Sequence, residues 1–302
     1  MRIRNVLLTS AAALLCAASV PANATSLHTW VSGANGDDST CTCARQSPCA
    51  TFQKALSLTT ASGIISVADP GDFGPLIILQ SVTIDGGNMG SIGFGGSLTG
   101  IDVDGVSSSI NVILRNLTIE GQGMGNYPIV VTSGNVNLTV DDCKLESFVT
   151  GGVFLSSAAV ENVLVTNTVI DGGNIANYGV ASTGVNVVAL DHVTIRRALQ
   201  FAVYNGVSGG LVQVTNSLLT QSVEGVYANA GTISVANTAI TSNQTGVCDA
   251  TGAKIRLDTN DIYDNTTAAI ANCGGQIKTS GTNRTSGAIL IPASLVSNSV
   301  LF

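Results

Sequence analysis

The stretch Asn162-Val-Leu-Val-Thr-Asn-Thr-Val-Ile170 decides the fold of this chain, because close copies of it recur along the sequence. Apolar and polar residues alternate within it, which is the pattern of a strand with one face toward a core. From Ile119 to Ile262, the last apolar positions of successive copies are separated by 26, 25, 25, 24, 21 and 22 residues. The other clear copies occupy residues 111–119, 137–145, 187–195, 211–219 and 232–240.

A second short apolar motif follows each copy at nearly constant spacing. It occurs at residues 152–153, 179–180, 202–203, 225–226, 246–247 and 269–270. Repeats of this length with at least two short strands and no helical period exclude helical arrays, leucine-rich repeats and propellers. The sequence therefore predicts an all-β chain folded as a single-stranded right-handed parallel β-helix, a solenoid with one coil for each repeat.

Alternation assigns the two faces of each strand. Val112, Leu114 and Ile119 are predicted to point inward, and Ile113, Arg115 and Glu120 outward. A polar position also recurs between the two halves of the motif, and we interpret it as an inward ladder of amides whose donors and acceptors satisfy one another. In this interpretation His192 is a buried substitute for asparagine. The ladder consists of Asn116, Asp142, Asn167, His192, Asn216 and Asn237.

The two ends of the chain have different patterns from the repeat. Arg2 and Arg4, an apolar run and the small residues around Ala24 are typical of a secretory signal peptide cleaved after Ala24, which predicts a secreted, periplasmic or cell-surface protein without a transmembrane segment in the mature chain. Apolar residues at helical spacing between Thr51 and Leu58 predict a short N-terminal capping helix. The predicted segments are a signal peptide at 1–24, a disulfide-pinned cap at 25–62, the β-helix at 63–275 and a closing segment at 276–302.

Charge restricts the partners of the mature chain. Without Arg2 and Arg4, 10 basic residues remain against 19 acidic ones, a net charge near −9. Such a surface repels phosphate backbones, so nucleic acid is not an expected partner. Charged residues make up only 10% of the chain and aromatic residues 4%. A surface rich in hydroxyl and amide groups is therefore expected.

Six cysteines remain once Cys16 leaves with the signal peptide. An even number in an oxidising compartment indicates disulfides. We expect Cys49 to pair with Cys41 or Cys43, and Cys248 with Cys273. Cys143 has no partner in this scheme. A zinc site at the first group lacks a histidine or a fourth cysteine.

Several segments of the chain are similar to the pectate-lyase-like superfamily of right-handed β-helices, most closely to secreted bacterial members of uncharacterised function. Trp30-Val-Ser-Gly, Pro48-Cys-Ala-Thr-Phe52 and Gly71-Asp-Phe-Gly74 resemble the opening of such proteins, and the resemblance covers residues 63–275. It implies the fold, whereas the activities within the superfamily include lyases, hydrolases and epimerases. The galacturonase motifs Gly-His-Gly and Arg-x-Lys do not occur in this sequence.

An acidic column provides the candidate metal site. Glu120, Glu146 and Asp171 fall at one outward position on successive coils, and Arg196 follows on the next. Carboxylates about 4.8 Å apart repel one another unless a cation lies among them. Calcium with these oxygen ligands is one interpretation, neutralisation by Arg196 a second, and a solvated face a third.

Arg196, Arg197 and Asp191 are the candidate catalytic residues, since an arginine can take a proton from a uronate in a lyase. Charge pairing with the neighbouring carboxylates is the simpler interpretation of these residues. It would leave them without a catalytic role.

Tyr204 and Tyr227, 23 residues apart, are predicted to stack on one flank and are the candidate carbohydrate-binding residues. Phe154 and Phe201 are assigned to the core. The preferred function is a non-catalytic surface-interaction or carbohydrate-binding module with no cofactor, whose partner is a polysaccharide or another cell-surface component. The alternative is a polysaccharide lyase or hydrolase acting on an acidic glycan. The oligomeric state stays open.

Overall fold

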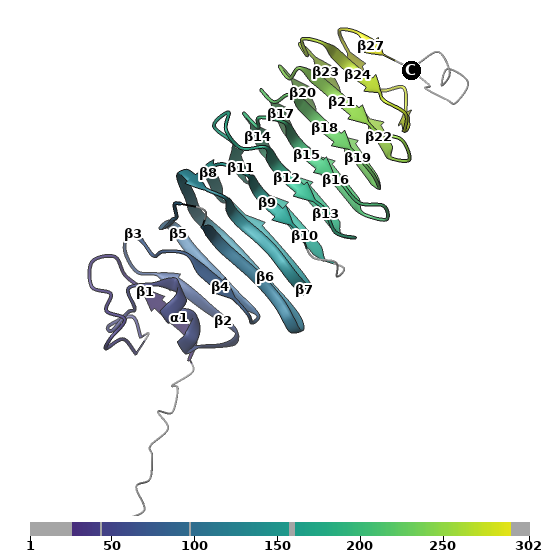
Figure 1. The fold of residues 1–302 in the computed structure, drawn as a ribbon. Helices are drawn as coiled ribbons and strands as arrows, with labels where there is room; N and C mark the ends of the chain where they lie inside the picture. The colour runs from purple at the N-terminus through teal and green to yellow at the C-terminus, as the bar shows by residue number, and fades with distance from the viewer. Residues whose placement is uncertain (1–25, 43, 97, 157–160, 291–302) are drawn as a thin grey trace, which may run out of the picture.

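A computed structural model describes residues 26–42, 44–96, 98–156 and 161–290. The predicted signal peptide with its cleavage after Ala24, and Cys43, lie outside the described residues. In the part of the chain that is described, no helix is both long and apolar enough to cross a membrane. The chain winds into a coil of parallel strands that stack along one axis into three sheets (Figure 1).

Each full turn of the coil contributes one strand to each sheet. The first sheet contains β1 (Ser26–Val31), β2 (Thr59–Val67), β10 (Asn162–Thr166), β13 (Val187–Asp191), β16 (Leu211–Thr215), β19 (Thr232–Ala236), β22 (Lys254–Asp258) and β25 (Gln276–Thr279). The second contains β3 (Gly71–Asp72), β8 (Lys144–Phe148), β11 (Val169–Asp171), β14 (Thr194–Arg196), β17 (Leu218–Thr220), β20 (Ala239–Thr241), β23 (Asp261–Tyr263) and β26 (Arg284–Thr285). The third contains β4 (Leu76–Ile78), β9 (Gly151–Leu155), β12 (Tyr178–Ser182), β15 (Phe201–Asn205), β18 (Glu224–Ala228), β21 (Thr245–Asp249), β24 (Ala268–Asn272) and β27 (Ile289–Leu290). Three longer strands turn corners and join more than one sheet: β5 (Val82–Gly93), β6 (Thr99–Gly125) and β7 (Tyr127–Asp141).

Constant register stacks like residues into an apolar core. Val165 of β10 pairs with Val140 of β7 on one side and with Leu190 of β13 on the other, and all three are buried. The predicted inward residues Val112, Leu114 and Ile119 are fully buried, whereas Ile113, Arg115 and Glu120 are exposed. The alternation in the sequence therefore assigned the two faces correctly.

The predicted amide ladder is wrong in position. Asn116, Asp142, Asn167, His192, Asn216 and Asn237 have φ between 49° and 56°, and they form the corner between the first and second sheets. All but Asn116 are exposed, and His192 contacts Oδ2 of Asp191 through Nδ1 at 2.9 Å. The left-handed conformation explains why the position recurs as Asn, Asp or His, because these residues tolerate it better than others.

A buried asparagine ladder does exist at neighbouring positions. Asn243 accepts a hydrogen bond from the backbone N–H of Ser222 at 2.9 Å and donates to the carbonyl oxygen of Leu219 at 3.1 Å. Asn265, one coil later, accepts from the N–H of Asn243 at 3.0 Å and donates to the carbonyl of Ile240 at 3.0 Å. Asn260 and Asn283 repeat the arrangement at the other corner. These side chains supply the partners that buried backbone groups require.

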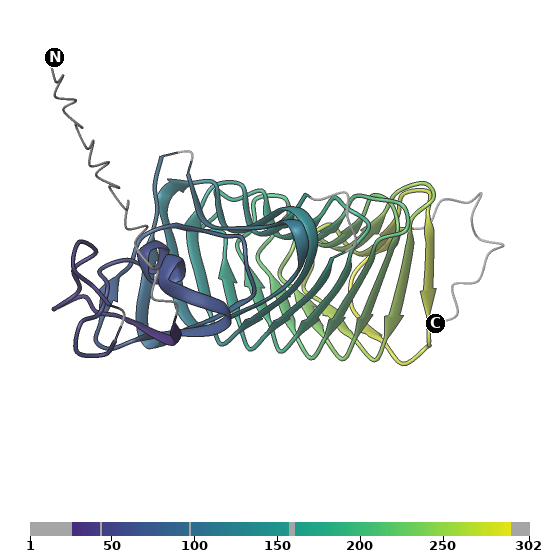
Figure 2. The same ribbon diagram turned by 90° about the horizontal axis from the view of Figure 1, so that it is seen from below.

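The N-terminal end of the stack is covered as predicted. Helix α1 (Phe52–Leu58) begins after Thr51, whose hydroxyl accepts from the N–H of Lys54 at 3.1 Å, and it buries Phe52, Ala55 and Leu56 (Figure 2). Cys41 and Cys49 form a disulfide beside it. The coil is longer than the predicted range 63–275, because β1 already pairs with β2 in parallel and β25, β26 and β27 continue the three sheets.

Candidate functional site

Aromatic side chains form a continuous row on the outer surface of the third sheet. Phe154 contacts Tyr127 and Tyr178 with ring centroids 4.8 and 6.2 Å apart. The row continues through contacts of 4.8 to 6.0 Å among the later rings. Each ring is half-buried, so one part packs on the sheet and the rest meets solvent. We call this surface the aromatic strip; it consists of Tyr127, Phe154, Tyr178, Phe201, Tyr204 and Tyr227.

The aromatic side chains lie beside one another because the strands of the third sheet pair with a constant register. Tyr178 of β12 pairs with Phe201 of β15, and Tyr204 of β15 pairs with Tyr227 of β18. The strip extends from β7 to β18, across four strand spacings of about 4.8 Å, and is therefore about 19 Å long. The strip runs along the axis of the coil across β7, β9, β12, β15 and β18, strands that face the viewer in Figure 1.

Part of the aromatic strip is predictable from the sequence. Tyr204 and Tyr227 stack as expected, with centroids 6.0 Å apart and ring planes at 26°. The assignment of Phe154 and Phe201 to the core is wrong, because both point outward and are only half-buried. Tyr178 and Phe201 are 23 residues apart, the same spacing as Tyr204 and Tyr227. This spacing indicates that Phe201 stacks on Tyr178 at an outward position, as Tyr227 does on Tyr204.

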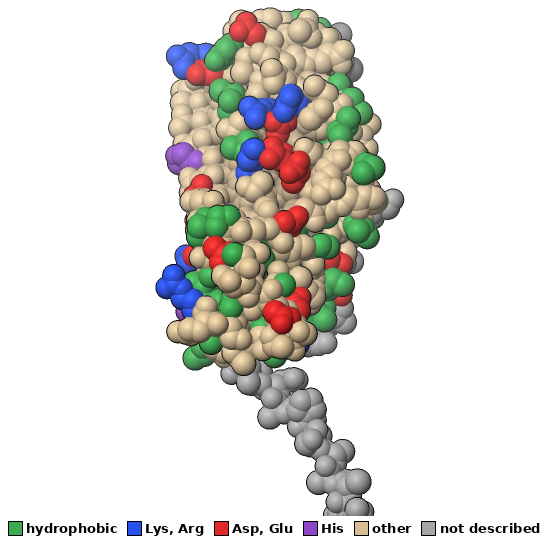
Figure 3. All heavy atoms as spheres, turned by 90° about the vertical axis from the view of Figure 1, so that its left-hand side faces the viewer, with side chains coloured by type: hydrophobic (Ala, Val, Ile, Leu, Met, Phe, Trp, Pro, Cys, Tyr) green, Lys and Arg blue, Asp and Glu red, His purple; other side chains and the backbone are tan. Residues whose placement is uncertain are grey.

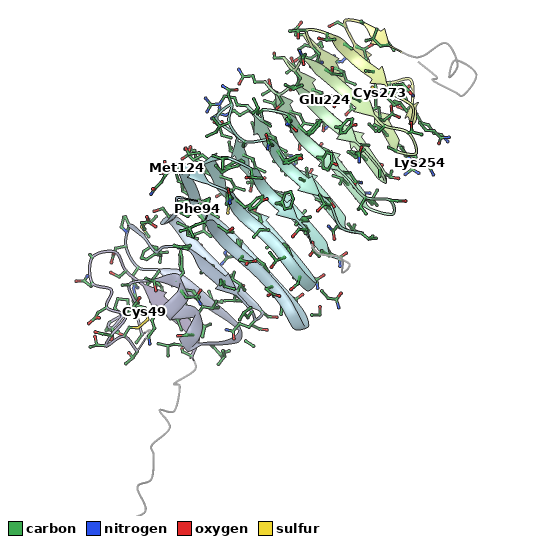
Figure 4. The ribbon with its side chains drawn as sticks, in the orientation of Figure 1. Cys49, Phe94, Met124, Glu224, Lys254 and Cys273 are labelled. Atoms are coloured by element: carbon green, nitrogen blue, oxygen red, sulfur yellow. A yellow bond between two sulfur atoms is a disulfide. The ribbon has the colours of Figure 1, made fainter. Side chains whose placement is uncertain are left out.

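Glu224 lies at one end of the aromatic strip and was not singled out from the sequence. Glu224 of β18 pairs with Phe201 of β15, and Figure 4 shows Glu224 on the same face of the coil as Cys273. Burial raises the pKa of the Glu224 carboxyl to about 7, and its buried Oε2 atom has no hydrogen-bond partner among the described residues. This carboxyl is thus protonated in a large fraction of molecules at neutral pH, when it can donate a hydrogen bond.

Cys248 of β21 pairs with Tyr227 of β18, one coil further along the stack. Its sulfur atom lies 2.8 Å from the sulfur atom of Cys273. Both are thiols in the structure. Burial, followed by the hydrogen bond with Cys273, raises the pKa of the Cys248 thiol. The sequence thus placed the two sulfur atoms together correctly, and the disulfide between them stays a prediction.

The acidic column forms as expected, since Glu120 pairs with Glu146, Glu146 with Asp171, and Asp171 with Arg196. Acidic side chains gather beside basic ones on the face seen in Figure 3. Lys144 contacts Glu146 at 2.8 Å, and Arg196 contacts Asp171 at 2.8 Å. Among the described residues, the oxygen atoms of Glu120, Glu146 and Asp171 do not converge within 4.8 Å of one another as a set of metal ligands.

Asp171 is held by two arginines at once. Burial raises its pKa, but the hydrogen bonds from Arg197 and the Gly173 N–H, together with the charges of Arg196 and Arg197, outweigh burial and leave the pKa lowered. Asp191 lies apart from them and contacts His192, Thr215 and Asn216 instead. The three candidate catalytic residues are therefore divided between two clusters of polar contacts.

Compared by sequence, the chain matches no family model and no curated protein. The crystal structure of pectate lyase Pel9A superposes with a TM-score of 0.64, at 13% identity, over 89% of this chain and 78% of that one. The fold is the pectate-lyase-like right-handed β-helix. The A-module of mannuronan C-5 epimerase AlgE4 from Azotobacter vinelandii gives a TM-score of 0.50, at 14% identity, over 79% of this chain and 85% of that one. At these identities the likeness establishes the fold alone.

Chemically, the aromatic strip offers stacking surfaces and one protonated carboxyl. Along the outward positions described for β9, β12, β15, β18 and β21, Glu224 is the only carboxylate. Hydrolysis of a glycosidic bond ordinarily uses two carboxyl groups on either side of that bond. A second carboxyl with a raised pKa, that of Asp102 on β6, pairs with Val130 beyond the other end of the strip.

Proposed function

We propose that this protein binds a polysaccharide along the aromatic strip without cleaving it. The observation that carries the proposal is the row of half-buried rings in mutual contact, about 19 Å long. Aromatic rings have apolar faces that pack against the C–H faces of sugars, while their exposed edges tolerate water. A row that follows the axis of the coil suits an extended polymer better than a compact ligand.

The polar groups along the strip support the same ligand. Thr150 and Asn229 lie beside the hydroxyl groups of Tyr127 and Tyr204 and provide further polar groups along the row. Glu224, when protonated, donates a hydrogen bond to a sugar oxygen at the end of the row. We therefore expect binding to weaken as the pH rises through about 7, where this carboxyl loses its proton.

Affinity electrophoresis against a panel of soluble polysaccharides tests the proposal. Replacing Phe201 or Tyr227 by Ala should lower the affinity about tenfold each, the equivalent of about 1.4 kcal/mol. Tyr263→Ala is the matched control, because this tyrosine is exposed on the second sheet, outside the aromatic strip. Equal binding by all variants and wild type would contradict the proposal.

The alternative function, a lyase or hydrolase acting on an acidic glycan, is examined in the same experiment. Incubation with polyuronates, with and without calcium, is followed by assay of reducing ends and of unsaturated products. The raised pKa of Glu224 would suit a general acid. Product formation that Glu224→Gln abolishes would replace the binding function by this catalytic one.

A further inference from the structure

Three basic side chains lie together on the outer face of the first sheet. Lys254 and Arg256 are two residues apart on β22, so they share a face, and Lys278 of β25 pairs directly with Arg256. All three are exposed, and Figure 4 shows Lys254 at the border of the face that carries Glu224. We call this group the basic triad.

The basic triad has no ion-pair partner among the described residues, in contrast to most other cations of the chain. Arg115 pairs with Asp85, Arg196 and Arg197 with Asp171, and Arg284 with Asp261. Lys144 pairs with Glu146, and the guanidinium of Arg45 lies 5.0 Å from the ring centre of Trp30.

Unpaired cations are unexpected in this protein. It has 19 acidic residues and a net charge of −7, so carboxylates were available for the triad. Like charges directly opposite each other on paired strands, as in Arg256 and Lys278, lower stability. A bound anion would offset that cost.

A recess beside the triad provides room for a ligand. Arg256 and Lys278 line a groove of about 490 Å³ over β16, β19, β22 and β25, together with the hydroxyl groups of Thr215, Ser234 and Ser280. A smaller recess of about 80 Å³ lies between Lys254, Arg256, Gln276 and Lys278. The groove also contains Asp258, which accepts hydrogen bonds from Ser280 and Thr282, and these lower its pKa. These hydrogen bonds keep Asp258 ionised, so three cations face one carboxylate on this surface and its local net charge is positive.

We propose that the basic triad and its groove bind an anionic sugar unit of a glycan through the carboxylate or sulfate group. The three cations supply charge-assisted hydrogen bonds to that group, and the side chains of Gln213 and Ser234, which also line the groove, bind the sugar ring. Three cations suit one or a few anionic sugar units, whereas the net negative charge of the molecule disfavours any long, densely charged polymer, nucleic acid included. This site is on a different sheet from the aromatic strip and does not rest on the function proposed for that strip.

The test measures binding of a short oligogalacturonate, a sulfated oligosaccharide, an uncharged oligosaccharide and duplex DNA by isothermal titration calorimetry at several salt concentrations. Inorganic sulfate, added as a competitor, shows how much of the binding rests on the anionic group. Wild type should bind the carboxylated or the sulfated glycan, and which of the two binds identifies the group. The double variant Arg256→Gln, Lys278→Gln should lose at least tenfold in affinity and show a weaker dependence on salt.

Lys54→Gln is the matched control, because it removes one positive charge from α1, at the other end of the coil. It should bind like wild type. Tm separates folding from binding: removing the repulsion between Arg256 and Lys278 should leave the Tm of the double variant equal or higher. Failure of wild type to bind either anionic glycan would overturn the proposal, as would equal losses from Lys54→Gln. Tighter binding of DNA than of both glycans through the same residues would also overturn it.

Discussion

Replacing Asn243 by Ala should destabilise the fold far more than replacing Asn237 by Ala. The Asn243 side chain is 1% exposed and hydrogen-bonds the N–H of Ser222 and the carbonyl oxygen of Leu219. Removing it leaves two backbone groups buried without partners, at about 1–3 kcal/mol each, or about 2–6 kcal/mol in total. Asn237 is exposed with φ 49°, and its side chain donates a hydrogen bond to Asn216 that water can replace, so Asn237→Ala costs mainly the strain of a left-handed alanine, about 1–2 kcal/mol.

Urea titration followed by circular dichroism measures the difference, provided that both variants keep the same dependence of the unfolding free energy on urea concentration. A change in that slope would indicate that single coils unfold separately, and native-state hydrogen exchange of β20 and β21 would then give the local free energies. If Asn237→Ala costs as much as Asn243→Ala or more, the buried asparagine ladder does not stabilise the coil.

Other perturbations should follow the same physical rules. Ile170→Asp buries a charge in the core and should cost several kcal/mol in a denaturant titration, whereas Lys144→Ala, at an exposed site, should change stability by about 0.5 kcal/mol or less. Without denaturant, thiol labelling should leave Cys143 unmodified, because burial raises its pKa to about 12; rapid labelling would show that this part of the core opens. The Glu224 carboxyl has a pKa of about 7 in the folded state and about 4.5 in the unfolded state, so the folded state holds its proton more tightly. The stability of wild type relative to Glu224→Gln should therefore fall as the pH rises from about 4.5 to about 7. A difference in Tm between the two proteins that does not change across this range would refute the raised pKa. Calcium should leave Tm unchanged in wild type and in Glu146→Gln, because basic side chains already pair with two of the three carboxylates in the acidic column; a rise confined to wild type would restore the metal site.

The sequence predicted the coil and its faces because both follow from local, periodic information. Alternation fixed the inward positions of Val112 and Leu114, and constant spacing brought Glu146 beside Asp171. The recurring Asn, Asp or His position does not form the predicted inward ladder, because an inward ladder of amides and a corner with a left-handed backbone favour the same residue types. Only the backbone conformation distinguishes them, as the φ of 49° at Asn167 does.

The functional surfaces were less predictable, since they depend on which side chains meet across coils. The raised pKa of Glu224 results from burial by neighbours on other coils. The unpaired state of Arg256 depends on where every nearby carboxylate points, and no short stretch of sequence contains that information. Tyr204 and Tyr227 were found because both lie in the repeat at equal spacing.

The stacking of coils also determines how the molecule loses structure. Each strand in the middle of the stack hydrogen-bonds only to the coil before it and the coil after it, as β13 does with β10 and β16. Opening can therefore begin at an end and advance one coil at a time. The first coils are held by the Cys41–Cys49 disulfide and α1, so amide protons near β1 and β2 should exchange more slowly than those near β26 and β27. The basic triad, on β22 and β25, lies in the part of the coil where fraying and ligand binding would compete.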